Sequence, residues 1–242
     1  MGRSRPGRRK RTALTVLAVF GIVLFSALGI CQVERRSWKL ALIEAVDARV
    51  QASPVSAPPP AVWPSIERER HAYLHVVARG RFLHDRETLV RAVTDLGTGF
   101  WVLTPLGTDT GFVVLVNRGY VPPERAVQAT RARNLPAHAT VTGLLRTSEP
   151  GGAFLRRNDP VADRWFSRDV QAIAAARQLV RVAPYFIDAD ADARPKHAWP
   201  RAGLTVIRFQ NNHLVYALTW FGLAGLCIFG LVLLLRRPRS AA

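Results

Sequence analysis

The side chains best suited to chemistry lie at the start of the second long apolar segment. There the sequence reads Asn211-Asn-His-Leu-Val-Tyr-Ala-Leu-Thr-Trp-Phe221. On a helix, five of these and following side chains would share one face: His213, Tyr216, Ala217, Trp220 and Ala224. A neutral imidazole beside aromatic rings is what an axial ligand of haem iron requires. The alternative is an interfacial belt, in which the aromatic rings mark a membrane surface and the histidine is merely solvated.

The remaining polar side chains form no recognisable catalytic or metal-binding pattern. The other five histidines are scattered without ligand spacing: His71, His75, His84, His138 and His197. Asp85 and Glu87 stand two positions apart, and an exported hydrolase could use such a pair. We expect instead an exposed loop pair with Arg86 between them, because no nucleophile elbow, zinc signature or phosphate-binding loop accompanies them. The sequence therefore predicts a protein that is not an enzyme.

The two cysteines, Cys31 and Cys227, lie at the end of one apolar segment and inside the other. The region between these segments consequently has no thiol for a disulfide, a Cys-x-x-Cys motif or a thiolate metal site. We expect this region to be stable without disulfides.

Two apolar segments are long enough to cross a membrane. Ala13–Cys31 and Leu214–Leu235 contain no charged residue, and as helices they would be roughly 29 and 33 Å long, against a hydrocarbon core of about 30 Å. The alternatives are a cleaved signal peptide for the first segment and a buried core helix for the second. The first lacks a good small-residue cleavage pattern, and core helices rarely avoid charge over such a length. We interpret both segments as retained transmembrane helices.

The distribution of charge sets the expected orientation. The formal net charge is +17, and nine basic residues lie in two short tails that contain no acidic residue: Arg3, Arg5, Arg8, Arg9, Lys10, Arg11, Arg236, Arg237 and Arg239. Basic tails beside membrane spans favour the cytoplasmic side and attract anionic lipid. We therefore expect both termini in the cytoplasm, a periplasmic domain between the spans, and no nucleic-acid binding.

The predicted fold class is a membrane protein with two transmembrane helices flanking a β-rich (α+β) exoplasmic domain. The expected order is a basic tail (1–12), the first span (13–31), a helical stalk with a proline-rich spacer (32–64), the β-rich domain (65–212), the second span (213–235) and a second basic tail (236–242). Within the domain, strands are predicted over 71–82, 100–106, 112–117, 140–145, 179–187 and 204–209, a hairpin loop over 106–111 and a helix over 169–178.

The chain also carries short motifs whose order and spacing resemble the surfeit locus protein 1 family. They are Gly80-Arg-Phe82 with Glu87, Gly97-Thr-Gly-Phe-Trp-Val-Leu-Thr-Pro-Leu106, Val114-Leu-Val-Asn-Arg-Gly-Tyr-Val-Pro122, Gly143-Leu-Leu-Arg146, Asn158-Asp-Pro160, Trp165-Phe-Ser-Arg-Asp169, Pro184-Tyr-Phe-Ile-Asp188 and the Asn211–Phe221 segment. One departure is Tyr120, where the family commonly has tryptophan.

The resemblance implies a factor that assists the assembly of haem-copper terminal oxidases by delivering or retaining haem a. Its expected partners are the oxidase catalytic subunit, other assembly factors and membrane lipid, and its expected location is a bacterial inner membrane. The resemblance assigns haem handling to His213, and our hypothesis is that His213 is the axial ligand while Tyr216 and Trp220 pack the macrocycle. Arg118 could pair with a carboxylate or a haem propionate, or could satisfy loop carbonyls. The alternative function is a membrane scaffold that stabilises an assembly intermediate without binding haem.

Overall fold

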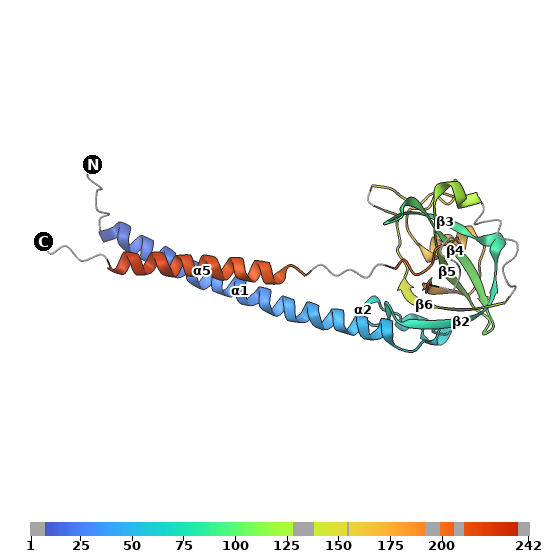
Figure 1. The fold of residues 1–242 in the computed structure, drawn as a ribbon, viewed down its shortest axis with the longest axis horizontal. Coiled ribbons are helices and arrows are strands. Elements are labelled where there is room, and N and C mark those ends of the chain that lie inside the picture. Colours follow the sequence, from blue (N-terminus) through green and yellow to red (C-terminus); the bar gives the residue numbers. More distant parts are fainter. Residues whose placement is uncertain (1–7, 128–137, 154, 192–198, 206–210, 237–242) are drawn as a thin grey trace. The chain divides into compact units, whose positions relative to one another are not determined.

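The computed structural model describes residues 8–127, 138–153, 155–191, 199–205 and 211–236 (Figure 1). The chain divides into two compact units, each described by itself. A helical unit comprises Met1–Ala45 and Arg208–Ala242, and a barrel unit comprises Val46–Ile207.

The helical unit contains α1 (Arg8–Gln51) and α5 (His213–Arg236). Both helices are long and apolar enough to cross a membrane, and most of their large apolar side chains are exposed, unlike those of a soluble core helix. Small residues allow the two helices to approach: Ala217 and Ala224 are buried, and the space for a side chain at Gly29 is filled by the Phe221 ring. Such contacts between small residues are typical of helix pairs in membranes. The helical stalk expected after the first span is present as an unbroken continuation of α1 to Gln51.

In the described residues, the barrel unit is one seven-stranded sheet closed on itself. Its strands are β1 (Val55–Ser56), β2 (His75–Phe82), β3 (Thr88–Thr94), β4 (Gly97–Thr108), β5 (Val113–Val121), β6 (Ala139–Thr147) and β7 (Val182–Ala189). They follow the order β1-β2-β6-β7-β5-β4-β3, and an additional pairing of β2 with β4 closes the barrel. The β1–β2 and β5–β7 pairs are parallel and the others antiparallel.

Among the described residues, the short helices are α2 (Arg68–His71), α4 (Val170–Ala176) and the 3₁₀ turns Pro60–Ser65, His84–Arg86 and Pro123–Arg125. The helix predicted over 169–178 is confirmed as α4, and Asp169 caps it by accepting a hydrogen bond from the backbone N–H of Ala172 at 3.1 Å. Aspartate is favoured at this position because its side chain satisfies an N–H group that the first turn leaves without a partner.

The central strands are buried on both faces. Alternate residues of β5 enter two clusters: Val114 and Val116 join one with Ile187, whereas Leu115 joins the other with Phe186, under α4. Because successive side chains of a strand point to opposite faces, a strand covered on both sides has a continuous apolar sequence. This explains why the strands over 112–117 and 179–187 could be predicted without clear alternation.

Several segments differ from expectation. The proline-rich segment 53–64 was expected as an extended spacer, but it supplies β1 and a 3₁₀ turn, and Trp63 packs edge-on against Phe112 at 5.7 Å. Strand β3 is absent from the sequence-based prediction. The hairpin expected around 106–111 is confirmed, because β4 and β5 pair as antiparallel neighbours, but its loop is shorter than expected, since β4 extends to Thr108. Most of the strand expected over 204–209, and His197, lie outside the described residues.

Candidate functional site

His213 begins α5 and contacts the other long helix. Its ring Nδ1 lies 2.8 Å from the side-chain oxygen Oε1 of Gln32 on α1. Because a carbonyl oxygen can only accept, Nδ1 carries the proton, and the lone pair of the neutral ring is on Nε2. Nε2 has no hydrogen-bond partner among the described residues. The imidazole is therefore held in the tautomer that can bind a metal through Nε2.

Only some of the side chains predicted to share one face of α5 lie against the protein. Ala217 and Ala224 are buried, and Trp220 stacks on Phe25 of α1 with ring centroids 5.8 Å apart and an interplanar angle of 21°. Tyr216 is 56% exposed, and its ring stacks on no other ring among the described residues. The structure thus brings His213 and Trp220 to the side of α5 that contacts α1, while Tyr216 is exposed.

One further polar group precedes α5. The side-chain oxygen Oδ1 of Asn211 is buried and has no hydrogen-bond partner in the part of the chain that the structure describes. A buried acceptor without a donor costs roughly 1 to 3 kcal/mol. Asn211 lies two residues before His213. A hydrogen-bond donor of a bound molecule would therefore be favourable at its side-chain oxygen.

Arg118 belongs to the barrel unit, on β5, and its side chain is 7% exposed. Its Nη1 lies 3.3 Å from Oε2 of Glu87, which also accepts a hydrogen bond from Thr104 at 2.9 Å. The guanidinium lies over the ring of Phe82 at 5.5 Å. Among the expected partners of Arg118, the structure therefore shows a carboxylate of the chain itself.

Glu87 is not the exposed partner of Asp85 that was expected. The Asp85 side chain is 77% exposed, whereas that of Glu87 is 2% exposed. The expectation is wrong because Glu87 precedes β3, which the sequence did not reveal, and turns inward beside Arg118. Its second oxygen, Oε1, is buried without a partner in the described structure. Burial raises the pKa of Glu87 to about 7, against the opposing effects of Thr104 and Arg118.

This pKa predicts a pH dependence of stability. A carboxyl whose pKa in the folded state exceeds its ordinary value of 4.5 contributes stability that is fully present below pH 4.5 and lost as the pH rises through about 7. Between about pH 5 and pH 8, we expect the free energy of unfolding to fall by about 2 to 3 kcal/mol more in the wild-type chain than in Glu87→Gln. Denaturant titrations of the detergent-solubilised chain at several pH values measure this difference. Parallel pH profiles would contradict it.

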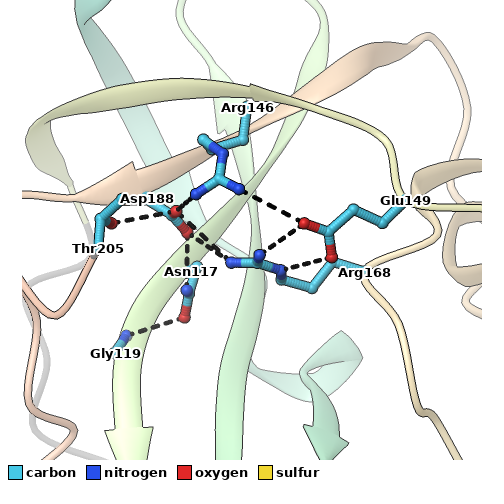
Figure 2. Close-up of polar contacts among 7 residues, drawn as sticks. All are labelled: Asn117, Gly119, Arg146, Glu149, Arg168, Asp188 and Thr205. Atoms are coloured by element: carbon cyan, nitrogen blue, oxygen red, sulfur yellow. Dashed lines mark hydrogen bonds and ion pairs between the residues drawn. The ribbon is translucent and has the colours of Figure 1, made fainter. Parts of the chain in front are cut away.

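A second polar cluster, which the sequence-based prediction did not include, surrounds Asp188 on β7 (Figure 2). The Asp188 side chain is 3% exposed and accepts hydrogen bonds from four residues. Arg146 donates at 2.9 Å, Arg168 at 3.2 Å, Asn117 at 2.8 Å and Thr205 at 3.1 Å. Asp188 therefore connects β5, β6 and β7 with two segments outside the sheet.

Glu149 completes this cluster on its outer side. Figure 2 shows its carboxylate facing Arg146 and Arg168, with distances of 3.5 and 2.6 Å. Although burial acts to lower the pKa of Arg168, the charges of Asp188 and Glu149 outweigh it and raise that pKa, so the guanidinium is charged. The side-chain oxygen of Asn117 also accepts from the backbone N–H of Gly119 at 3.1 Å. The two acids balance the two arginines, which makes the cluster a structural crosslink.

An open cleft of about 560 Å³ borders this cluster. Arg146 and Arg168 form its polar wall, and Trp101 with Val93 and Leu96 of the β3–β4 hairpin forms an apolar side. The arginines are already paired within the protein, so the cleft has no uncompensated charge to attract an ion. Among the described residues, no group of three or more His, Cys, Asp or Glu side chains is placed to hold a metal ion.

The polar residues of this cluster carried a signal that was not used. Asn117, Arg146, Arg168 and Asp188 all lie within the motifs that carry the family resemblance. Asn117 and Asp188 are also polar residues at the end of apolar strand sequences, where burial demands a partner. The sequence could have nominated these positions, but not their pairing across 71 residues.

Comparison with known proteins gives one consistent result. The SURF1 family model matches residues 19–225. Surfeit locus protein 1 of Xenopus tropicalis is 34% identical over 226 residues, covering 86% of this chain and 71% of the relative. The human protein of the same name is 33% identical over 227 residues, covering 86% and 73%. A SURF1-like protein of Monosiga brevicollis is 34% identical over 229 residues, covering 89% and 85%.

Proposed function

Because this chain belongs to the SURF1 family, known for cytochrome oxidase assembly, we propose that it holds haem a and passes it to the catalytic subunit of a haem-copper oxidase. Haem is cargo in this proposal, and the chain contributes binding and release without a chemical conversion. The observation that carries the proposal is the His213–Gln32 hydrogen bond, which leaves Nε2 available.

The proposal includes membrane placement. Both long helices would cross the bacterial inner membrane, with the two basic tails in the cytoplasm and the barrel in the periplasm. Their length, apolar composition and exposed apolar side chains support this arrangement. The positive charge of both tails supports the orientation, since basic residues are retained on the cytoplasmic side.

The residues around His213 suit a macrocycle. Haem needs a nitrogen lone pair for its iron and apolar, aromatic surface for its ring. Nε2 of His213 supplies the first, and the stacked rings of Trp220 and Phe25 supply aromatic surface on the same helix pair. The unpartnered oxygen of Asn211 could accept a hydrogen bond from a polar substituent. The exposed ring of Tyr216 could cover the macrocycle from its outer side.

The test is the optical spectrum of the full chain purified from cells that make haem a. We expect a haem absorbance band in the wild type, its loss in His213→Ala, and its retention in His138→Ala, because His138 is an exposed barrel histidine paired with Asp109. In Gln32→Leu we expect about tenfold weaker haem retention, since removing the group that orients a metal-binding histidine typically costs 10- to 100-fold.

Two results would contradict the proposal. If the wild-type protein showed no haem absorbance band, the chain would not bind haem. If the band were equally strong in His213→Ala, His213 would not be the haem ligand. If oxidase assembly also survived in His213→Ala cells, the chain would be a scaffold that supports the catalytic subunit through protein contacts alone.

A further inference from the structure

A basic cleft on the barrel unit is lined by residues that do not belong to the Asp188 cluster. Its lining residues are Arg91, Arg156, Arg157, Asn158, Asp159, Arg164 and Phe166, and we call it the arginine cleft. The space within it is about 510 Å³. Four arginines and one aspartate give the lining a formal charge of +3. All but Arg91 come from one loop between β6 and α4.

Hydrogen bonds inside this loop fix its conformation. The side-chain oxygen of Asn158 accepts from the backbone N–H groups of Phe166 and Ser167 at 2.8 and 3.2 Å. The Ser167 hydroxyl accepts from the N–H of Gly152 and the amide of Asn158, both at 3.0 Å. These are residues of the Asn-Asp-Pro and Trp-Phe-Ser-Arg-Asp motifs. The motifs therefore shape the loop, and the arginines are presented from an ordered surface.

The arginines of the cleft are only partly neutralised. Asp159 pairs with Arg164 at 2.6 Å. Arg91, Arg156 and Arg157 form no ion pair or side-chain hydrogen bond within the described ranges. Aromatic rings orient two of them: the Arg91 guanidinium lies 5.8 Å from the Phe100 ring and 5.9 Å from the Phe166 ring, and that of Arg156 lies 5.6 Å from Phe166. A guanidinium stacked on an aromatic ring is oriented but keeps its N–H groups free for a carboxylate.

The loop that carries most of the cleft's residues also exposes two large apolar side chains. Leu155 is 89% exposed and Val161 is 99% exposed. Leu155 is also held at a positive φ of 58°, a conformation that is unfavourable for leucine. Apolar residues beside unpaired charges are typical of surfaces that bind another molecule.

We propose that the arginine cleft docks an acidic segment of another protein, with carboxylates on the free guanidiniums and apolar side chains on Leu155 and Val161. The charge of the lining selects an anionic partner. Several guanidiniums face one open cleft, so a chain segment with repeated carboxylates can contact more than one of them, and guanidinium N–H groups fit carboxylates in pairs. The proposal does not depend on haem binding by His213.

The test uses the full chain in neutral detergent and a fluorescent twelve-residue peptide in which Glu and Asp alternate with Leu and Val. Fluorescence anisotropy measures its Kd for the wild type, Arg156→Gln/Arg157→Gln and the control Arg79→Gln/Arg81→Gln. The control removes the same charge from exposed positions on β2. We expect the cleft variant to bind about tenfold more weakly, since each lost charged contact costs roughly a factor of three, and the control to stay within about twofold.

Three outcomes would overturn the proposal. Equal weakening in the two variants would mean that the peptide responds only to overall charge. If a matched peptide with Gln and Asn in place of Glu and Asp bound with equal affinity, the cleft would not recognise carboxylates. Binding to phosphatidylglycerol vesicles that needs Arg156 and Arg157, without such a need for the peptide, would assign the cleft to lipid headgroups.

Discussion

Asp188→Ala is expected to lower the free energy of unfolding of the barrel by about 3 to 5 kcal/mol, or to prevent folding. The carboxylate is buried and neutralises Arg146 and Arg168, which are only 19% and 14% exposed. Without it, two guanidiniums remain close together with Glu149 as their acidic partner, and Asn117 loses its acceptor. Urea denaturation of the solubilised chain, followed by tryptophan fluorescence, measures the loss.

Asp190→Ala provides the matched control. Asp190 also accepts from a basic side chain, since it lies 2.8 Å from His75, but its own side chain is 37% exposed. Exposed ion pairs contribute roughly 1 kcal/mol or less. A loss at Asp188 no larger than the loss at Asp190 would mean that the cluster in Figure 2 is not a structural crosslink.

Gly119→Ala is expected to destabilise the barrel by about 3 kcal/mol or more. Gly119 has a φ of +123°, which alanine rarely adopts, and a Cβ atom there would collide with the backbone carbonyl of Arg201. Relief would require separating Tyr120 from Arg201, whose backbone groups exchange two hydrogen bonds of 2.9 Å. The same denaturation measurement applies.

Gly111→Ala is the control that distinguishes backbone strain at a positive φ from the steric collision of a Cβ atom with Arg201. Gly111 also has a positive φ, +84°, but nothing lies within 4 Å of a Cβ atom there. Its substitution should cost only the conformational strain, about 1 kcal/mol. Similar losses in the two variants would mean that the close approach to Arg201 carries no energetic penalty.

The sequence predicted the elements of the fold better than their assembly. Apolar runs located both long helices, five strand regions and α4, because periodicity and length are local properties. Strand β3 was missed, since polar and small residues interrupt its apolar positions. Barrel closure could not be predicted, because it depends on three-residue pairing between β2 and β4.

For the candidate sites, too, the sequence predicted what depends on local spacing but not what depends on contacts between distant segments. His213 and Trp220 were nominated by helical spacing, and their contacts with α1 follow from that spacing once the partner helix is known. Glu87 was misjudged because its burial depends on Arg118, 31 residues away. The Asp188 cluster was missed entirely, since its members come from five segments and no local pattern connects them.

The order in which the barrel is synthesised restricts how it can fold. Its ring pairs His75 of β2 with Leu144 of β6, and Val113 of β5 with Val182 of β7. Strands so far apart in the sequence lose much chain entropy when they come together, before their favourable contacts have formed. A high contact order therefore slows folding. Until β7 leaves the ribosome, β5 and β6 have unpaired edges that can join other chains. Among the described strands β7 comes last in the chain, so we expect the barrel to fold slowly and to be exposed to aggregation until β7 is available.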